Sequence, residues 1–308
     1  RPIYGGGGAR GAPARKGGKC VRAIPRLTLN NGVEMPVLGL GMMFQDDGLN
    51  AAVQTALDAG YRLFDNAPLY GNEAACGEAL RRSGVARGEL FISSKLRNAC
   101  HRYEDALREF DLSLKRFQTD YLDLYLIHWP CPGLDLYTEA WRALEHLYDA
   151  GLVRAIGLSN FHAPHIARIL GMCRIPPAVN QLECNPYHSI APLRAYCHDH
   201  GILTEAWFPL GGPAVLPSGE PAPGRPLLGD GRLGALAQRY GKSPAQIALR
   251  WEIQSGMIAI PKSGRPERIR ENADIFDFSL SEADTKAIDA MNCNRRVGPD
   301  PDTYNGMF

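Results

Sequence analysis

Four residues of this chain have side chains suited to moving a proton onto an oxygen atom: Asp65, Tyr70, Lys95 and His128. A phenol with a pKa of about 10 is a weak proton donor at neutral pH. A neighbouring ammonium group is expected to lower that pKa, and a carboxylate paired with the lysine holds the ammonium in place. A histidine can orient a carbonyl oxygen by donating a hydrogen bond to it. The set therefore suits protonation of an oxygen while hydride reaches the adjacent carbon.

Three of these residues stand at the end of a short apolar run, and such runs alternate with segments of helical periodicity. The runs are 37–38, 62–65, 90–95, 122–128, 153–159, 178–182, 202–207 and 257–261. A hairpin signal, Asn31 followed by Gly32 within residues 26–34, precedes them. About eight strand–helix units without a break in composition predict an α/β fold, a single (β/α)8 TIM barrel with an N-terminal β-hairpin. An open doubly wound sheet is the alternative.

Other polar and aromatic residues also follow predicted strands. They are Ser159, Asn160, Gln181, Trp207, Lys262 and Ser263. In a parallel barrel, reactive groups gather at the carboxyl ends of the strands. We therefore expect these side chains to share one mouth of the barrel with the first four.

Five blocks of sequence, in order along the chain, resemble the motifs of the aldo-keto reductase family. They are residues 60–73 (GYRLFDNAPLYGNE), 92–95 (ISSK), 126–130 (LIHWP), 156–161 (IGLSNF) and 260–263 (IPKS). The resemblance runs from about Arg26 to Asp302. It implies a (β/α)8 barrel and NADPH-dependent reduction of aldehydes and ketones, with Tyr70 as general acid and Asp65, Lys95 and His128 as its partners.

The same resemblance assigns residues to the cofactor, NADP(H). Ser159, Asn160 and Gln181 would hold the nicotinamide carboxamide, and Trp207 would stack on its ring. At the far end of the cofactor, the 2′-phosphate would meet Lys262, Ser263 and Arg268, and the adenine would meet Glu271 and Asn272. Two cations and a hydroxyl near a helix start favour a phosphate dianion, which argues for NADP(H) over NAD(H).

Two residues depart from the family pattern beside the cofactor. Arg265 stands where relatives often have a threonine that caps the helix, and we expect it to add a third cation at the phosphate. Phe208 stands where a small hydroxyl residue is common, so one hydrogen bond to the pyrophosphate is expected to be lost.

The substrate pocket is expected to include His128, Trp129 and Met43, with residues 304–308 as a further wall. A flexible methionine wall tolerates varied substrates. The run from Glu205 to Trp207 resembles the diketogluconate reductase-like branch of the family. That resemblance implies small polar carbonyls, dicarbonyls or sugar-derived aldehydes as substrates.

Two other functions remain open at this stage. A barrel lyase would use Lys95 as a Schiff-base nucleophile, although this leaves Tyr70 and the phosphate-binding residues without a role. A non-catalytic NADP(H)-binding protein of the same fold would use cofactor occupancy as a redox sensor. The complete set of Asp65, Tyr70, Lys95 and His128 favours an enzyme over both.

The charge and the apolar runs of the sequence limit which partners and which cellular location we expect. The formal net charge of the 308 residues is +1, so nothing indicates nucleic acid, and no apolar run is long enough for a membrane span. We expect a monomer. Residues 1–33 contain basic residues and no acid. We expect 1–24 to be a flexible Gly-rich tail and 25–308 to be the barrel, in a cytoplasmic protein, with organelle targeting by the tail as the alternative.

Metal binding and disulfides are not expected. His198 and His200 are spaced like a metal pair, but they precede Gly201 at a predicted helix end, where histidines interact with the helix dipole. The eight cysteines show neither a C-x-x-C motif nor zinc-site spacing. We therefore predict no metal site and reduced thiols.

Overall fold

The structure is a computed structural model that describes residues 23–44, 48–212 and 226–306. Residues 1–22 of the predicted tail lie outside the described residues, as do 213–225 of the predicted surface loop at 211–231. Within the described ranges, no helix combines the length and apolarity needed to cross a bilayer.

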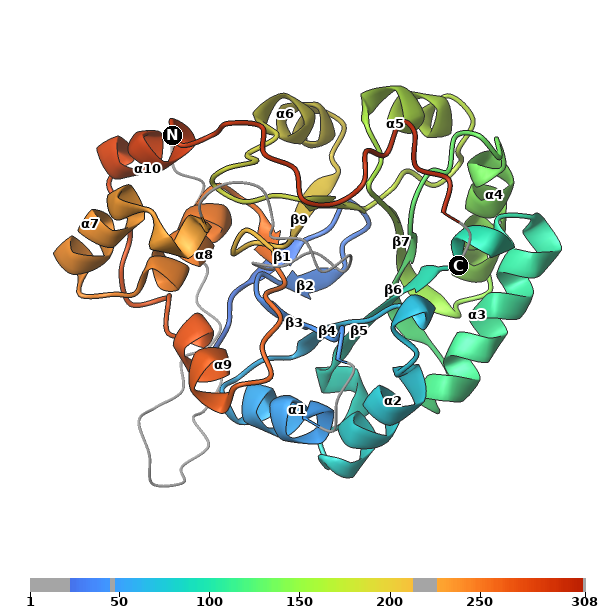
Figure 1. Cartoon of the computed structure of the whole chain (residues 1–308). Coiled ribbons are helices and arrows are strands. Elements are labelled where there is room, and N and C mark those ends of the chain that lie inside the picture. Colours follow the sequence, from blue (N-terminus) through green and yellow to red (C-terminus); the bar gives the residue numbers. More distant parts are fainter. Residues whose placement is uncertain (1–22, 45–47, 213–225, 307–308) are drawn as a thin grey trace.

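Eight parallel strands form a barrel at the centre of the molecule (Figure 1). They are β3 (Gly39–Gly41), β4 (Leu63–Asp65), β5 (Phe91–Leu96), β6 (Leu122–Ile127), β7 (Val153–Ser159), β8 (Val179–Glu183), β9 (Leu203–Trp207) and β10 (Ile258–Ala259). Each pairs with its neighbour in chain order, and a parallel bridge between Leu38 and Ala259 closes the circle. The predicted barrel is confirmed, and the open-sheet alternative is wrong.

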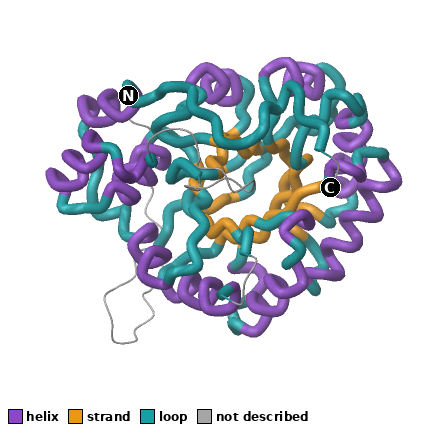
Figure 2. The backbone as a smooth tube through the Cα atoms, viewed as in Figure 1, coloured by secondary structure: helices purple, strands orange, loops and turns teal. Residues whose placement is uncertain are grey.

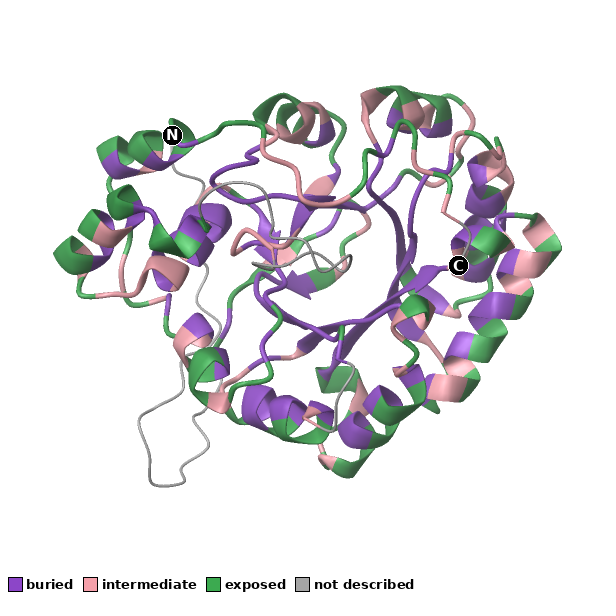
Figure 3. Cartoon of the chain, viewed as in Figure 1, coloured by how far each residue is buried: buried purple, intermediate pink, exposed green. Residues whose placement is uncertain are grey.

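Ten α-helices among the described residues surround the strands, and Figure 2 shows helices as a ring outside the barrel. They are α1 (Leu49–Asp58), α2 (Glu73–Arg82), α3 (Tyr103–Phe117), α4 (Tyr137–Asp149), α5 (Ala163–Leu170), α6 (Ala191–Asp199), α7 (Gly231–Tyr240), α8 (Pro244–Gln254), α9 (Pro266–Ala273) and α10 (Glu282–Asp289). Their inner faces are buried against the strands (Figure 3), as with Trp141 and Leu144 of α4. Burial of these apolar faces is the main force that holds the ring in place.

Local sequence signals explain where several helices begin and end. Ser243 accepts a hydrogen bond from the amide of Gln246, whose side chain bonds back to Ser243, so α8 starts with the predicted capping box. Ser281 caps α10, because its side chain accepts a hydrogen bond from the amide of Asp284. After α4, Gly151 takes a φ of 70°, a left-handed conformation that glycine adopts without strain.

The predicted hairpin consists of β1 (Arg26–Thr28) and β2 (Glu34–Pro36), which pair antiparallel. It belongs to the end of the barrel where the strands begin. Leu29 and Met35 are buried there in one apolar cluster with Leu63 and Phe91. The hairpin therefore closes the amino end of the barrel and leaves the carboxyl end as the mouth.

The segment after α10 leads to the carboxyl end of the chain past α6 and α5 (Figure 1). The Glu183 carboxylate, at the end of β8, accepts hydrogen bonds of 2.7 Å from the amides of both Val297 and Gly298. Further along, Asn98 donates a 2.7 Å hydrogen bond to the carbonyl oxygen of Gly306. We call residues 294–306 the C-terminal strap, because groups that follow β5 and end β8 tie it down across the barrel mouth.

Gly77 in α2 offers a test of packing between helices. A Cβ atom there would lie 2.4 Å from the carbonyl oxygen of Phe117 at the end of α3, whereas a Cβ at Gly234 in α7 would meet nothing within 4 Å. Gly77→Ala should therefore destabilise the fold by about 1–3 kcal/mol through overpacking. Gly234→Ala, the matched control, should stabilise it by about 0.5–1 kcal/mol through helix propensity. Chemical denaturation measures both, and an equal effect of the two changes would contradict the packing argument.

Candidate active site

A buried ion pair lies at the centre of the site. The Nζ atom of Lys95 on β5 is 2.7 Å from Oδ2 of Asp65 on β4, and both side chains are almost completely shielded from solvent. Nζ also donates to the carbonyl oxygen of Asn66, at 2.9 Å. Burial lowers the pKa of Lys95, but Asp65 and the neighbouring Tyr70 and Glu205 outweigh burial and raise it above its usual value. A protonated amine is not a nucleophile, so the geometry disfavours the Schiff-base lyase.

The second oxygen of Asp65 is also occupied. Oδ1 accepts hydrogen bonds from Oγ of Ser93, at 2.6 Å, and from Nε2 of Gln181 on β8, at 2.9 Å. Side chains of β5 and β8 therefore hold the Asp65 carboxylate of β4 in place. This carboxylate in turn holds the ammonium of Lys95.

Tyr70 lies beside this pair. It ends a short 3-10 helix, Pro68–Tyr70, in the loop after β4. The Lys95 Nζ atom is 5.5 Å from the centroid of the Tyr70 ring. Burial raises the pKa of Tyr70, and the charge and hydrogen bonding of Lys95 lower it, with the balance above the usual value. The lysine acts in the predicted direction, but the expected net lowering is not found because burial has the larger effect.

His128 directly follows β6 and completes the group. Its ring meets the Tyr70 ring edge to face, with centroids 6.5 Å apart. Burial, and then the positive charge of Lys95, hold the pKa of His128 well below its usual range. The imidazole is therefore neutral at physiological pH, with a hydrogen on one of its two ring nitrogens.

The residues assigned to the nicotinamide lie on β7, β8 and β9 or directly after β7. Asn160 adopts a positive φ of 64°, and its Nδ2 donates to the carbonyl oxygen of His128 and to Oγ of Ser159, both at 3.0 Å. Its Oδ1 accepts a 2.9 Å hydrogen bond from Nε1 of Trp207, which fixes the edge of the indole. One network therefore joins the Trp207 ring to the loop that carries His128.

Glu205 is a functional candidate that the sequence analysis used only as a family marker. It lies on β9 two residues before Trp207, so both side chains face the barrel interior. Nε2 of Gln181 donates to Oε2 of Glu205 at 2.8 Å, as well as to Asp65. Burial, and then the charge of Asp65, raise the pKa of Glu205 to about 8. One signal in the sequence could have identified Glu205: it is a charged residue inside the apolar run 202–207, and it lies on the same face of the strand as Trp207.

Cationic residues collect at the start of α9, where a phosphate was predicted. Lys262, Arg265 and Arg268 are exposed, and the Lys262 ammonium lies 4.9 Å from the centroid of the Phe44 ring. Oγ of Ser263 accepts from the amide of Arg265, at 3.1 Å, while the Arg265 side chain makes no cap, as expected.

The two residues predicted to meet the adenine follow on α9. Glu271 and Asn272 come three and four positions after Arg268, so they share one face of the helix with it. Asn272 is buried and Glu271 is half-buried. The structure thus places Arg268, Glu271 and Asn272 on α9, and Lys262, Ser263 and Arg265 in the segment that leads into this helix.

The predicted substrate walls lie at the mouth. Met43 follows β3 and is 45% exposed. The ring of Trp129, which follows His128, is 4.6 Å from the ring of Tyr304, centroid to centroid. Tyr304 belongs to the C-terminal strap, so the strap lies against Trp129, while its part in a substrate pocket stays a prediction. Residues 307 and 308 lie outside the described residues.

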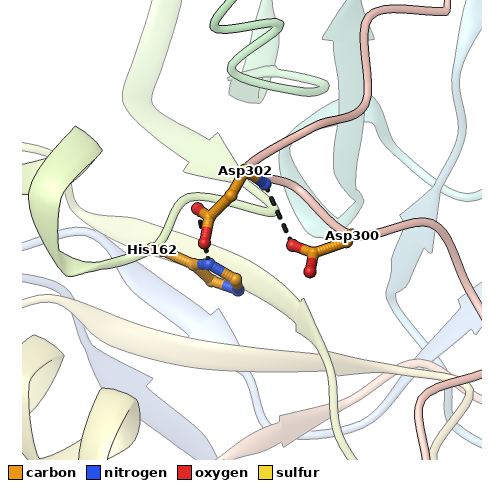
Figure 4. A group of neighbouring side chains, drawn as sticks. All are labelled: His162, Asp300 and Asp302. Atoms are coloured by element: carbon orange, nitrogen blue, oxygen red, sulfur yellow. Dashed lines mark hydrogen bonds and ion pairs between the residues drawn. The ribbon is translucent and has the colours of Figure 1, made fainter.

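A second polar cluster holds another part of the strap (Figure 4). Nδ1 of His162, at the start of α5, is 2.8 Å from Oδ1 of Asp302, and Asp300 lies beside them. The Arg296 guanidinium is 3.2 Å from the other ring nitrogen of His162. This positive charge opposes the binding of a metal cation by His162, Asp300 and Asp302.

The two histidines that are spaced like a metal pair have other contacts. His198 contacts Asp199, and a ring nitrogen of His200 is 2.8 Å from the carbonyl oxygen of Tyr196.

The raised pKa of Glu205 predicts a pH dependence of stability. A carboxyl whose pKa is higher in the folded than in the unfolded protein contributes stability below its unfolded pKa, and this contribution is lost as pH rises through the folded pKa, here about 8. Glu205→Gln removes that titration. The melting temperature of the variant relative to the parent should therefore rise between about pH 5 and about pH 9. A difference that stays constant over this range would contradict the assignment.

Comparison with known proteins agrees with this geometry. The model of the "Aldo/keto reductase family" matches residues 37–293. The chain is 48% identical to the glyoxal reductase of Bacillus subtilis over 276 residues, which are 89% of this chain and 95% of the relative. It is 44% identical to the methylglyoxal reductase DkgA of Yersinia pestis over 284 residues, 91% of this chain and 97% of the relative.

A solved structure supports the same conclusion. The crystal structure of a Bombyx mori aldo-keto reductase in complex with NADP superimposes with a TM-score of 0.83 at 37% identity, covering 91% of this chain and 97% of that one. The match of the family model over most of the chain and the identity to full-length relatives identify this protein as an enzyme of the aldo/keto reductase family.

Proposed function

We propose that this enzyme reduces small polar aldehydes, ketones and α-dicarbonyls to alcohols with NADPH. The observation that carries the proposal is the convergence of Tyr70, Lys95, Asp65 and His128 at the carboxyl ends of β4, β5 and β6. Tyr70 holds a dissociable proton next to a buried ammonium, and His128 offers a neutral N–H donor beside it.

Each group has a separate task in this reaction. NADPH, when bound, supplies the hydride. His128 donates a hydrogen bond to the carbonyl oxygen and positions it, and Tyr70 donates its proton to that oxygen as charge develops there. The ammonium of Lys95 stabilises the phenolate that remains. Asp65 keeps Lys95 protonated and in place.

The chemistry of the donor set fits NADP(H). Gln181 turns its amide nitrogen toward two carboxyl groups, Asp65 and Glu205, so its carbonyl oxygen is left to accept from the nicotinamide carboxamide. Ser159 and Asn160 would hold the rest of that amide, and Trp207 would stack on the ring. Lys262, Ser263, Arg265 and Arg268 would bind the 2′-phosphate, with Glu271 and Asn272 at the adenine. Cations at a helix start that form no ion pair with the described residues suit a dianion.

The substrate class rests on the relatives and on the mouth of the barrel. Two relatives above 40% identity are named glyoxal reductase and methylglyoxal reductase. Met43, Trp129 and His128 would line the pocket, and the exposed thioether of Met43 would adapt to substrates of different shape. Small dicarbonyls are therefore the first compounds to test.

The role of Tyr70 predicts the effect of its hydroxyl. Tyr70→Phe should lower kcat for methylglyoxal about 10²–10⁴-fold, because the general acid is lost. NADPH affinity, measured by fluorescence titration, should not change. Tyr125→Phe is the control, because that hydroxyl is buried against α3 and has no hydrogen-bond partner among the described residues. Near-parental turnover of Tyr70→Phe would reject the role.

The phosphate site predicts the cofactor preference. Arg265→Ala should reduce the ratio of kcat/KM for NADPH to that for NADH by about tenfold, the effect of one lost charged contact. Kinetics with NADH should be unaffected. Arg270→Ala removes an exposed charge from the same helix, α9, away from its start, and should leave the ratio unchanged. An unchanged ratio in Arg265→Ala would remove Arg265 from the site.

A further inference from the structure

The indole of Trp207, at the end of β9, is in contact with protein groups at both of its ends. At the pyrrole end, Nε1 donates a 2.9 Å hydrogen bond to Oδ1 of Asn160. The Phe208 ring packs edge to face against the indole, with centroids 4.7 Å apart. At the benzene end lies the backbone of Gly298, which belongs to the C-terminal strap. The strap therefore reaches the aromatic residue that was assigned to the nicotinamide.

The contact between Gly298 and Trp207 leaves no room for a side chain. A Cβ atom added at Gly298 would lie 2.5 Å from Cη2 and 3.3 Å from Cζ2 of the indole. It would also lie 3.0 Å from Oε2 of Glu183. Carbon atoms in van der Waals contact are normally about 3.5–4.0 Å apart. Any larger residue at position 298 must therefore displace either the indole or the strap.

Close approach, and not backbone conformation, is the reason for a glycine at this position. Gly298 is not among the described glycines that have a positive φ, such as Gly211 and Gly212. Alanine would therefore not meet the penalty of a left-handed backbone there. What alanine does not fit is the space between the strap and the indole. Gly298→Ala is thus a probe of this one contact.

Glu183 fixes the strap at this point. Its two carboxylate oxygens accept 2.7 Å hydrogen bonds from the amides of Val297 and Gly298. Glu183 ends β8 and Trp207 ends β9, and the two residues are partners in the register of these neighbouring strands. Only 2% of Glu183 is exposed, so this anchor lies inside the protein. The same two strand ends therefore hold the strap and carry the indole that the strap contacts.

We propose that Gly298, held by Glu183, is a positioning residue that fixes the Trp207 indole for stacking on the nicotinamide ring of NADP(H). This rests on the proposed function, in which Trp207 meets that ring. With Asn160 at one end and Gly298 at the other, the indole is held in one orientation before the cofactor arrives. A surface that is ordered in advance loses less conformational entropy on binding. The C-terminal strap thus contributes to cofactor affinity as well as to the proposed substrate pocket.

Gly298→Ala tests the contact through NADPH binding. The added methyl group should displace the indole or the strap, and the dissociation constant for NADPH, measured by fluorescence titration, should rise about tenfold. The emission of Trp207, taken as the difference between spectra with and without Trp207→Phe, should shift in the cofactor-free protein. Gly133→Ala is the control, because its Cβ would lie 2.8 Å from Nδ2 of Asn305, a strap contact that does not include Trp207. The NADPH affinity of this control should change less than about twofold.

A double variant separates this contact from a general effect on the strap. A phenyl ring lacks the second ring of the indole, so in a Trp207→Phe background the methyl group of Gly298→Ala no longer meets it. There, Gly298→Ala should change the NADPH dissociation constant less than about twofold. Glu183→Gln approaches the contact from the other side, because its amide has one acceptor oxygen and cannot hold both strap amides. It should raise the dissociation constant about threefold or more.

Melting temperatures of all variants show whether folding alone is affected. If Gly298→Ala lowers the melting temperature but leaves NADPH affinity and Trp207 emission unchanged, the glycine serves only the fold and the inference is overturned. Equal losses of affinity with and without Trp207→Phe overturn it as well. Should Gly298→Ala not fold, Glu183→Gln decides, and an unchanged NADPH affinity in that variant rejects the inference. If the parent protein binds no NADPH, the proposed function fails instead.

Discussion

The ion pair between Lys95 and Asp65 lies inside the barrel, where two charges lose nearly all contact with water. Such a pair is tolerated only when further hydrogen bonds satisfy the remaining atoms of both partners. Ser93 and Gln181 occupy the free oxygen of Asp65, and the backbone of Asn66 takes a proton of the lysine. Strands β4, β5 and β8 must therefore keep their places around the barrel for the pair to exist.

The same burial sets the protonation state of the groups around the pair. It favours the neutral form of each: the pKa of Tyr70 and of Glu205 is raised, and the pKa of His128 is lowered. The phenol thus keeps its proton, and the imidazole carries no charge that would repel Lys95. A site with these states is prepared to give a proton to a substrate rather than to take one.

Much of this arrangement could be predicted from the sequence, because it follows from local patterns. Apolar runs gave seven of the barrel strands to within a residue or two, and strand ends placed Asp65, Lys95 and His128 at one mouth. The cap at Ser243 was visible from residue types alone. The net pKa direction of Tyr70 was not predictable, since it depends on how much burial opposes Lys95. The contacts of Glu205 and of the strap join residues far apart in sequence, and no local pattern reports them.

Two side chains of the barrel hold the C-terminal strap by its backbone: Glu183 accepts from two amides and Asn98 donates to a carbonyl, whereas Asp302 and Arg296 of the strap contact His162 through their own side chains. Backbone groups are the same whatever side chains the strap carries. The anchors therefore place little restriction on strap residues such as Tyr304, which faces Trp129. This part of the barrel mouth, one wall of the proposed pocket, is free to diverge in evolution, or to be exchanged by an engineer, while the barrel and its buried ion pair stay as they are.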